Sequence, residues 1–329
     1  MKKAIVLFLA LMLMLSVVAC TTEKGAETGE LEKVRVILDY LPNTNHTGIY
    51  VAVEKGYYKE EGLEVEIIQP SEGATETLIA TGQGEFGISY QEDVTYARTA
   101  EEPLPIKAIA AVIQHNTSGF ASYAPKGIKS PKDFEGKTYC GWGSPAEEAV
   151  IRAVMENAGA DFSKLKIASA DDAGFAAMKD KVDLTWIYYG WTGIEAEIQD
   201  FPINYIELRE LDERLDYYTP VIIASEDLLD KNPELARKFL KATEKGYLDS
   251  IEDPNGAADI LADAVPEYDR EFLRKSQQYL SPKYMEDTDR WGEMKAEVWD
   301  AYTGFMLENE LIPRDMPAKE AFTNEFLPK

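Results

Sequence analysis

A short apolar strand that leads into a polar turn and then a helix is the pattern that most constrains this fold. Its first copy runs from the apolar residues 34–38 into a turn that begins at Asp39, and its helix ends at Lys55 before a capping Gly56. The same order recurs after strands predicted at 86–89, 137–141 and 184–187. Strands that alternate with helices predict the α/β class.

The polar turns that follow these strands form the candidate site. In open α/β sheets, ligands bind at the carboxyl ends of strands, where the following helix also offers unpaired N–H groups. We therefore expect the first turn, with Asp39, Asn43, Asn45 and His46, to hydrogen-bond a small polar molecule. The two asparagines have an alternative role, because Asn side chains build Asx turns and cap helices. Capping does not require an imidazole, so His46 favours a binding role.

The later turns supply aromatic rings, amides and carboxylates. Their members are Tyr90, Gln91, Glu92, Trp142, Tyr188, Tyr189, Trp191 and Glu195. Aromatic faces can sandwich a flat heteroaromatic ring, which adds ~0.5–1.5 kcal/mol beyond the buried area. Carboxylates can accept from an amine or a ring N–H. Each aromatic residue could instead fill the core, but Trp191 lies between two glycines, where the backbone can approach a ligand closely.

Two changes along the chain predict where it crosses between lobes. The polar residues 114–119 follow a long apolar strand at 106–113, and residues 217–224 precede a part rich in helical patterns. We expect one lobe of residues 34–118 and 220–329 and a second lobe of residues 119–219. Helices are expected at 233–250, 255–264, 270–279 and 290–308. In the second lobe, the four residues from Ser144 to Glu147 have the pattern of a capping box.

The N-terminus predicts export and lipid attachment. Lys2 and Lys3 precede the apolar run 4–15, and small residues then lead to Cys20. This resembles a bacterial lipoprotein signal, which implies that residues 1–19 are a signal peptide and that Cys20 carries lipid. Residues 20–33 would then be a flexible tether. A plain transmembrane anchor is the alternative, but a membrane span needs about 20 apolar residues and this run is shorter.

The charge and the cysteine count exclude several classes of partner and site. The net charge is −25, and removal of Lys2 and Lys3 with the signal makes it −27 (−25 − 2). Such a surface repels nucleic acid and anionic lipid. Only Cys140, expected to be an inert buried thiol, remains after lipidation, so no disulfide forms within the chain and no cysteine-rich metal site is expected. No phosphate loop or nucleophile motif occurs, and we expect no catalytic residue, metal or cofactor.

Four segments together resemble a known family. They are Pro42–Gly48, Glu54–Tyr58 with Gly62-Leu63, Tyr90–Glu92, and Tyr188–Trp191. They are similar to the substrate-binding lipoproteins of ABC importers that salvage the pyrimidine precursor of thiamine, a family that also includes fungal enzymes that make this pyrimidine. The resemblance extends from about Val34 to the last helices. It implies a type II periplasmic-binding-protein fold, in which two α/β lobes joined by two crossings trap a ligand in the cleft between them.

The resemblance also implies a function. The protein would be a monomeric lipoprotein on the extracytoplasmic face of the cell membrane. It would capture formylaminopyrimidine or hydroxymethylpyrimidine by lobe closure and deliver it to an ABC transporter permease. The family motifs place eight residues in the cleft: Asn43, His46, Tyr90, Glu92, Tyr188, Tyr189, Trp191 and Glu195. The argument from strand-end turns adds Asp39, Asn45, Gln91 and Trp142.

Three alternatives stay open at this point. Relatives of this family also capture riboflavin, although its isoalloxazine ring needs a longer cleft. Fungal relatives use a histidine of the first turn and a bound pyridoxal phosphate as reactants, and His46 falls at that position. However, the sequence lacks their cysteine-rich segment and carries an export signal, so we expect no enzyme. The third alternative is a lipoprotein without a ligand, such as an adhesin or an assembly factor.

Overall fold

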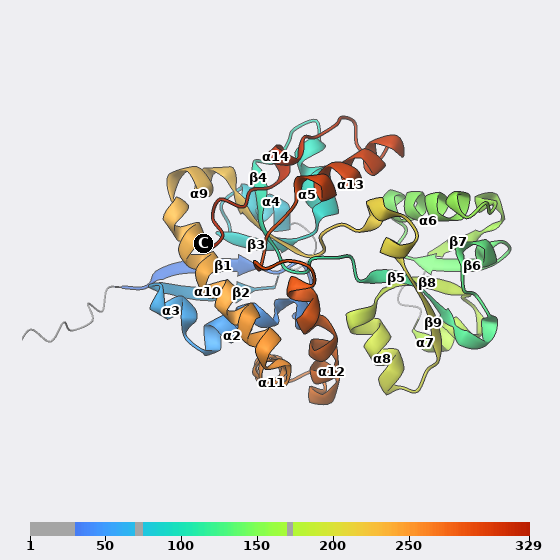
Figure 1. Ribbon diagram of the computed structural model, residues 1–329, viewed down its shortest axis with the longest axis horizontal. Helices are drawn as coiled ribbons and strands as arrows, with labels where there is room; N and C mark the ends of the chain where they lie inside the picture. Colours follow the sequence, from blue (N-terminus) through green and yellow to red (C-terminus); the bar gives the residue numbers. More distant parts are fainter. Residues whose placement is uncertain (1–29, 70–74, 170–173) are drawn as a thin grey trace, which may run out of the picture. The chain divides into compact units, whose positions relative to one another are not determined.

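Two five-stranded sheets with the same strand order organise the computed structural model (Figure 1), which describes residues 30–69, 75–169 and 174–329. The expected signal peptide and Cys20 lie outside the described residues. The first sheet has the order β2-β1-β3-β10-β4, and the second has the order β7-β6-β8-β5-β9. The strands are β1 (Glu32–Ile37), β2 (Leu63–Ile68), β3 (Phe86–Ser89), β4 (Ile106–Ala111), β5 (Ser118–Tyr123), β6 (Thr138–Gly141), β7 (Lys166–Ser169), β8 (Leu184–Tyr188), β9 (Ile203–Glu207) and β10 (Val221–Ser225).

One strand in each sheet runs against its neighbours, and this fixes where the polar turns lie. Strand β10 is antiparallel to β3 and β4, and β5 is antiparallel to β8 and β9. Each is the strand by which the chain enters a sheet after crossing from the other one. The strands by which it leaves, β4 and β9, therefore run with the parallel strands. The carboxyl ends of the parallel strands in both sheets consequently lie on the side of the crossings.

The helices follow the predicted alternation with strands and then dominate the C-terminal part. They are α2 (Thr47–Glu54), α3 (Tyr57–Glu60), α4 (Thr75–Ala80), α5 (Gln91–Thr99), α6 (Pro145–Asn157), α7 (Phe175–Asp180), α8 (Ile194–Ile198), α9 (Glu226–Lys231), α10 (Pro233–Glu252), α11 (Pro254–Ala264), α12 (Arg270–Leu280), α13 (Ala296–Glu308) and α14 (Ala318–Ala321). Within the described ranges, no helix is both long enough and apolar enough to cross a bilayer. The α/β class predicted from the sequence is confirmed.

Several boundaries differ from the sequence prediction, and two of the differences change the role of a segment. The segment 217–224 was expected to be only a crossing, but Val221–Ser225 forms the fully buried strand β10 between β3 and β4. Its unbroken apolar run suits a strand that is covered on both faces. The helix expected from Arg290 begins at Ala296, because Trp291 enters the core and Gly292 adopts a φ of 82° that no helix contains.

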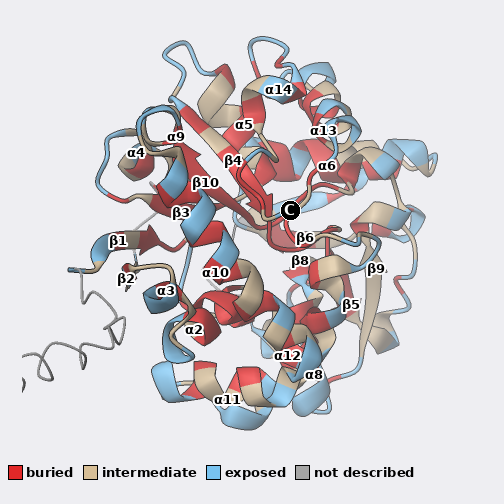
Figure 2. Cartoon of the chain, turned by 60° about the vertical axis from the view of Figure 1, so that its left-hand side comes forward, coloured by how far each residue is buried: buried red, intermediate tan, exposed pale blue. Residues whose placement is uncertain are grey.

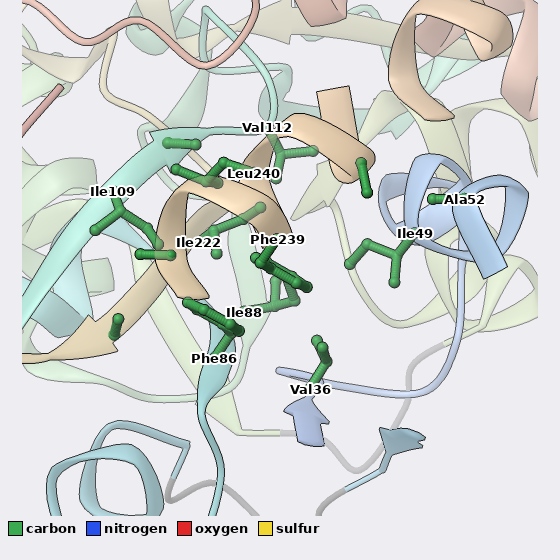
Figure 3. Packing of buried hydrophobic residues seen from close by; sticks show 14 of the residues in the cluster. Val36, Ile49, Ala52, Phe86, Ile88, Ile109, Val112, Ile222, Phe239 and Leu240 are labelled. Atoms are coloured by element: carbon green, nitrogen blue, oxygen red, sulfur yellow. The ribbon is translucent and has the colours of Figure 1, made fainter. Parts of the chain in front are cut away.

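The core of the first lobe joins α10 to its sheet. Phe239 of α10 stacks on Phe86 of β3, with ring centroids 3.9 Å apart and planes inclined by 7°. Ile88, Ile109 and Ile222 surround this pair (Figure 3). In Figure 2 the central strands β3 and β10 of this sheet are buried, whereas the outer faces of the helices are exposed. Burial of each large side chain contributes about 1.5–3 kcal/mol, so this core fixes the strand ends that carry the site.

Candidate functional site

Asp39, two residues beyond β1, is the centre of a hydrogen-bond network. Its Oδ1 lies 2.7 Å from His46 Nε2, and its Oδ2 accepts from the hydroxyl of Tyr90. The backbone N–H of Asn43 donates to His46 Nδ1 at 3.1 Å, so the ring proton lies on Nε2 and is donated to Asp39. Burial alone would raise the pKa of Asp39, but the electrostatic interaction with the N–H of His46 and the hydrogen bonds from His46 and Tyr90 together lower it. An ionised carboxylate is therefore held in one orientation.

Most polar groups of the first turn form hydrogen bonds that stabilise the turn itself. Asn43 is the N-cap of a 3-10 turn (Thr44–His46): its Oδ1 accepts from the N–H of Asn45 at 2.9 Å, and its Nδ2 donates to the carbonyl of Leu41 at 3.0 Å. His46 is completely buried. Asn45 is half-buried, and its carbonyl accepts from Tyr247 at 2.7 Å. Asp39 is thus positioned by the other members of its own turn.

The second turn divides its residues between the site and the core. Tyr90 contacts Asp39, and Glu92 accepts from the hydroxyl of Tyr302. Gln91 is buried and turned away: its Oε1 accepts from the N–H of Tyr218 at 2.9 Å, and its Nε2 donates to a carbonyl of α13 at 3.2 Å. Gln91 therefore ties the second crossing to α5 and α13.

Asp93 is a site residue that the sequence interpretation missed. Tyr90 is the extended N-cap of α5 and Asp93 is the third residue of this helix, so both lie at its N-terminal end. Burial and the charges of Glu76, Glu92 and Asp39 raise the pKa of Asp93 to about 7. The position of Asp93, three residues after Tyr90, was the signal in the sequence that could have identified it. This position favours Asp93 over Gln91 as the neighbour of Tyr90 in the candidate site.

The second lobe presents Tyr188 and Glu147 to these carboxylates. Tyr188, at the end of β8, is 37% exposed, yet burial raises the pKa of its phenol, and the charges of Glu92, Asp93 and Asp39 raise it further. The phenol therefore lies within electrostatic range of these three carboxylates, while water still reaches the side chain. Burial also raises the pKa of Glu92, and the charge of Glu147 adds to that effect. Carboxylates of the two lobes are thus close enough to interact.

Glu147 does not complete the predicted capping box. Its backbone N–H donates to Ser144 Oγ at 3.1 Å, as expected, but its carboxylate accepts from the N–H of Gly143 at 2.6 Å and from the hydroxyl of Tyr139. The carboxylate therefore lies over Gly141 at the end of β6 and bonds the residue before the N-cap, not the N–H of the N-cap itself. We missed it as a site residue because the capping pattern gave it a local role. Trp142, before it, is 57% exposed and packs on Trp186, with centroids 5.2 Å apart.

Three other predicted residues make contacts away from Asp39, Glu92 and Glu147. Tyr189 packs on Tyr205 and donates to Glu197 at 2.6 Å. Glu195 accepts from Gln199 at 2.8 Å. Trp191 meets Tyr268 and Phe272, which belong to the C-terminal part of the chain, edge to face at centroid distances of 5.2 and 4.5 Å. Its ring thus contributes to packing between the lobes.

The side chains that come together form an acidic cluster with tyrosine hydroxyls beside it. We use the name acidic cluster for Asp39, Glu76, Glu92, Asp93 and Glu147. In the described parts of the chain, no Lys or Arg forms an ion pair with these carboxylates, and no group of three His, Cys, Asp or Glu residues could hold a metal ion. The cluster suits a small ligand with several N–H donors or a positive charge, because carboxylates are acceptors and stabilise cations.

Comparison with known proteins identifies a matching family and several relatives of this chain. A family model described as NMT1/THI5 like matches residues 43–257. The chain is 29% identical to the formylaminopyrimidine-binding protein of Halalkalibacterium halodurans, over 98% of both chains. It is 27% identical to the riboflavin-binding protein RibY of Chloroflexus aurantiacus, over 100% of this chain and 99% of that one. It is 22% identical to the 4-amino-5-hydroxymethyl-2-methylpyrimidine phosphate synthase of Legionella pneumophila, over 90% and 92% of the two chains.

A solved structure shows the fold. The periplasmic aliphatic sulphonate binding protein SsuA from Escherichia coli matches with a TM-score of 0.69 and 14% identity, over 88% of this chain and 91% of that chain. Together with the two sheets and two crossings, this likeness confirms the predicted periplasmic-binding-protein fold.

Proposed function

This chain belongs to the NMT1/THI5-like family, and from that premise we propose that it is the solute-binding protein of an ABC importer for an aminopyrimidine. The ligand is of the formylaminopyrimidine or hydroxymethylpyrimidine type, in keeping with the name of the relative from Halalkalibacterium halodurans. The protein releases its ligand unchanged to a permease and acts as a monomer.

The observation that carries this proposal is the acidic cluster with Tyr90 and Tyr188 beside it. An aminopyrimidine presents an exocyclic amine next to ring nitrogens, and its ring can take up a proton. Carboxylates accept from the amine and from a protonated ring nitrogen, and charge-assisted bonds of this kind are roughly twice as strong as neutral ones. The aromatic ring of Tyr188 can cover the face of the pyrimidine.

Riboflavin is the second candidate, supported by the similarity to RibY. The polar edge of isoalloxazine carries two carbonyl groups and a single N–H. Carbonyl oxygens that face ionised carboxylates are unfavourable, because both groups are acceptors. The acidic cluster therefore favours the pyrimidine.

Calorimetry on the protein from Glu32 onward tests the choice of ligand. We expect tight binding of hydroxymethylpyrimidine or formylaminopyrimidine and none of riboflavin. Tyr188→Phe should weaken pyrimidine binding about 3- to 10-fold, because a ligand-facing hydroxyl is lost. Tyr189→Phe is the matched control and should leave affinity unchanged, since that hydroxyl bonds Glu197 on the outside. Tight riboflavin binding without pyrimidine binding would overturn the assignment.

A non-enzymatic role is supported by the state of His46. Its Nδ1 accepts from the backbone and its Nε2 donates to Asp39, so both ring nitrogens are engaged. A buried imidazole with no free nitrogen is unsuited to act as a reactant. The Legionella relative is named as a synthase, but it shares only 22% of its residues with this chain over the matched region.

Lobe closure is the proposed binding mechanism. We assign residues 34–118 and 220–329 to one lobe and residues 119–219 to the other, so that Asp39 and Tyr90 approach a ligand from one side and Tyr188 from the other. A ligand that contacts both lobes favours the closed form, because only that form makes both sets of contacts.

Lipid attachment at Cys20 would hold the protein at the extracytoplasmic face of the membrane. The motivation is the signal-like run that ends in small residues before Cys20. In bacteria that express the full chain, Cys20→Ser should move the protein from the membrane fraction to the soluble fraction and abolish incorporation of labelled palmitate. Cys140→Ser is the control, since Cys140 is a buried thiol of β6 and should leave both unchanged. Membrane retention of the Cys20 variant would contradict the anchor.

A further inference from the structure

We propose that Ser276 of α12 is a positioning residue. It couples the first turn, which contains Asp39 and His46, to the Tyr188 loop of the second lobe. This inference rests on the proposed binding function. Ser276 is completely buried. Its Oγ lies 2.6 Å from Thr44 Oγ1 in the first turn, and it donates to the carbonyl of Gly190 in the second lobe. One hydroxyl therefore contacts both elements that present ligand-facing side chains.

The direction of these hydrogen bonds is fixed. The carbonyl of Gly190 can only accept, so the single proton of Ser276 points to it. Thr44 must then donate to Ser276, which gives a chain of bonds from Thr44 through Ser276 to Gly190. We call this chain the hydroxyl relay. Thr44 is two residues before His46, and Gly190 is two residues after Tyr188, so each end of the relay lies next to a predicted site residue.

Both ends of the relay are held tightly. A Cβ at Gly190 would lie 2.8 Å from the Leu280 side chain, so a larger residue would push the carbonyl away from Ser276. The next residue, Trp191, fits edge to face against Phe272, whose ring centroid lies 4.5 Å away. At the other end, the carbonyl of Thr44 accepts from Tyr284 at 2.7 Å. The carbonyl of Gly190 can thus reach Ser276 only when the second lobe is seated on α12.

This geometry gives Ser276 a role in binding and not only in folding. When the lobes separate, the relay loses its link to Gly190, and the turn that orients Asp39 loses its connection to the second lobe. When they close, the link forms without water between its members, and buried hydrogen bonds of this kind reinforce one another. Ordering of the first turn and seating of the Tyr188 loop therefore favour each other.

Substitution of Ser276 by alanine in the full-length protein tests the relay. We expect the Kd for hydroxymethylpyrimidine to rise about 5- to 10-fold, the effect of losing one buried hydrogen-bonded hydroxyl. Amide hydrogen exchange in the 188–193 segment should become faster even without ligand. Ser250→Ala is the matched control: it also removes a buried helix serine, but that hydroxyl donates to Gly246 of its own helix at 2.7 Å. It should change neither quantity.

Substitutions of Thr44, the donor end of the hydroxyl relay, test the same proposal independently. Thr44→Val removes the donor hydroxyl and should raise the Kd by a similar factor, whereas Thr44→Ser keeps the hydroxyl and should restore wild-type affinity. The double variant Thr44→Val/Ser276→Ala should bind no more weakly than Ser276→Ala alone, because the two residues act through one chain. Fully additive effects, or exchange in Ser276→Ala that equals the Ser250→Ala control, would exclude the relay. Absence of pyrimidine binding by the wild type would instead refute the proposed function, and the exchange result would still decide the relay.

Discussion

Replacement of Gly246 by alanine should destabilise the protein by about 2 kcal/mol. Gly246 lies in α10, and a Cβ there would come within 1.9 Å of the carbonyl oxygen of Gly48 in α2. A backbone oxygen cannot rotate away, so the two helices would have to separate. Overpacking of this kind costs about 3 kcal/mol, and the better helix propensity of alanine returns about 1 kcal/mol. The midpoint of urea unfolding measures the change.

Gly304 of α13 is the matched control for this prediction. It is also a helical glycine, but a Cβ there would meet nothing within 4 Å. Gly304→Ala should therefore stabilise the protein by about 0.5–1 kcal/mol through helix propensity and reduced chain entropy. Because α2 begins at Thr47, immediately after His46, Gly246→Ala should also disturb the first turn and weaken pyrimidine binding. Equal shifts of the same sign in both variants would contradict the steric argument.

Replacement of Asp39 by asparagine should weaken aminopyrimidine binding about 10- to 100-fold. The carboxylate accepts from His46 and from Tyr90 and has further lone pairs for a ligand. An amide of the same size keeps only one acceptor oxygen, and its NH2 group would face the hydroxyl of Tyr90. It also removes the negative charge, and a hydrogen bond to a charged group contributes about 1.5–3 kcal/mol. Calorimetric titration with hydroxymethylpyrimidine measures the loss.

Asp249 offers a closely matched control. Its carboxylate also accepts from a basic side chain and a tyrosine, namely Lys55 at 2.6 Å and Tyr57 at 2.5 Å, but it lies on the outer side of α10. Asp249→Asn should lower stability slightly, because the surface ion pair is worth at most about 1 kcal/mol, and should leave the Kd unchanged. If Asp39→Asn bound the pyrimidine as well as this control, Asp39 would have only a structural role.

The sequence alone predicted the features that follow from local pattern and strand direction. Alternating strands and helices gave the α/β class, and polar residues at strand ends gave the region of the site. Asp39 and His46 come together because they belong to one short turn after β1. Tyr90 could be added because parallel strands end on the same side of a sheet, so successive turns converge.

Tertiary contacts decided which of the neighbouring side chains face one another. Gln91 was expected in the site, but its bonds to Tyr218 and to Val298, far along the chain, turn it into the core. Trp191 was expected to cover a ligand, but it packs against rings of the C-terminal part. A motif of adjacent residues does not show which side chain points into the site. Successive side chains of a helix point 100° apart, and packing decides which face of the helix turns towards the core.

Local patterns in the chain are therefore enough to predict strand-end turns rich in acceptors and rings. The folded chain alone brings Asp39 close enough to raise the pKa of Asp93 and Glu147 close enough to raise the pKa of Glu92, and it places Ser276 between two of the turns. The physical reason is that local patterns fix backbone conformation, whereas burial, charge and hydrogen-bond partners depend on segments that meet only after both lobes have formed.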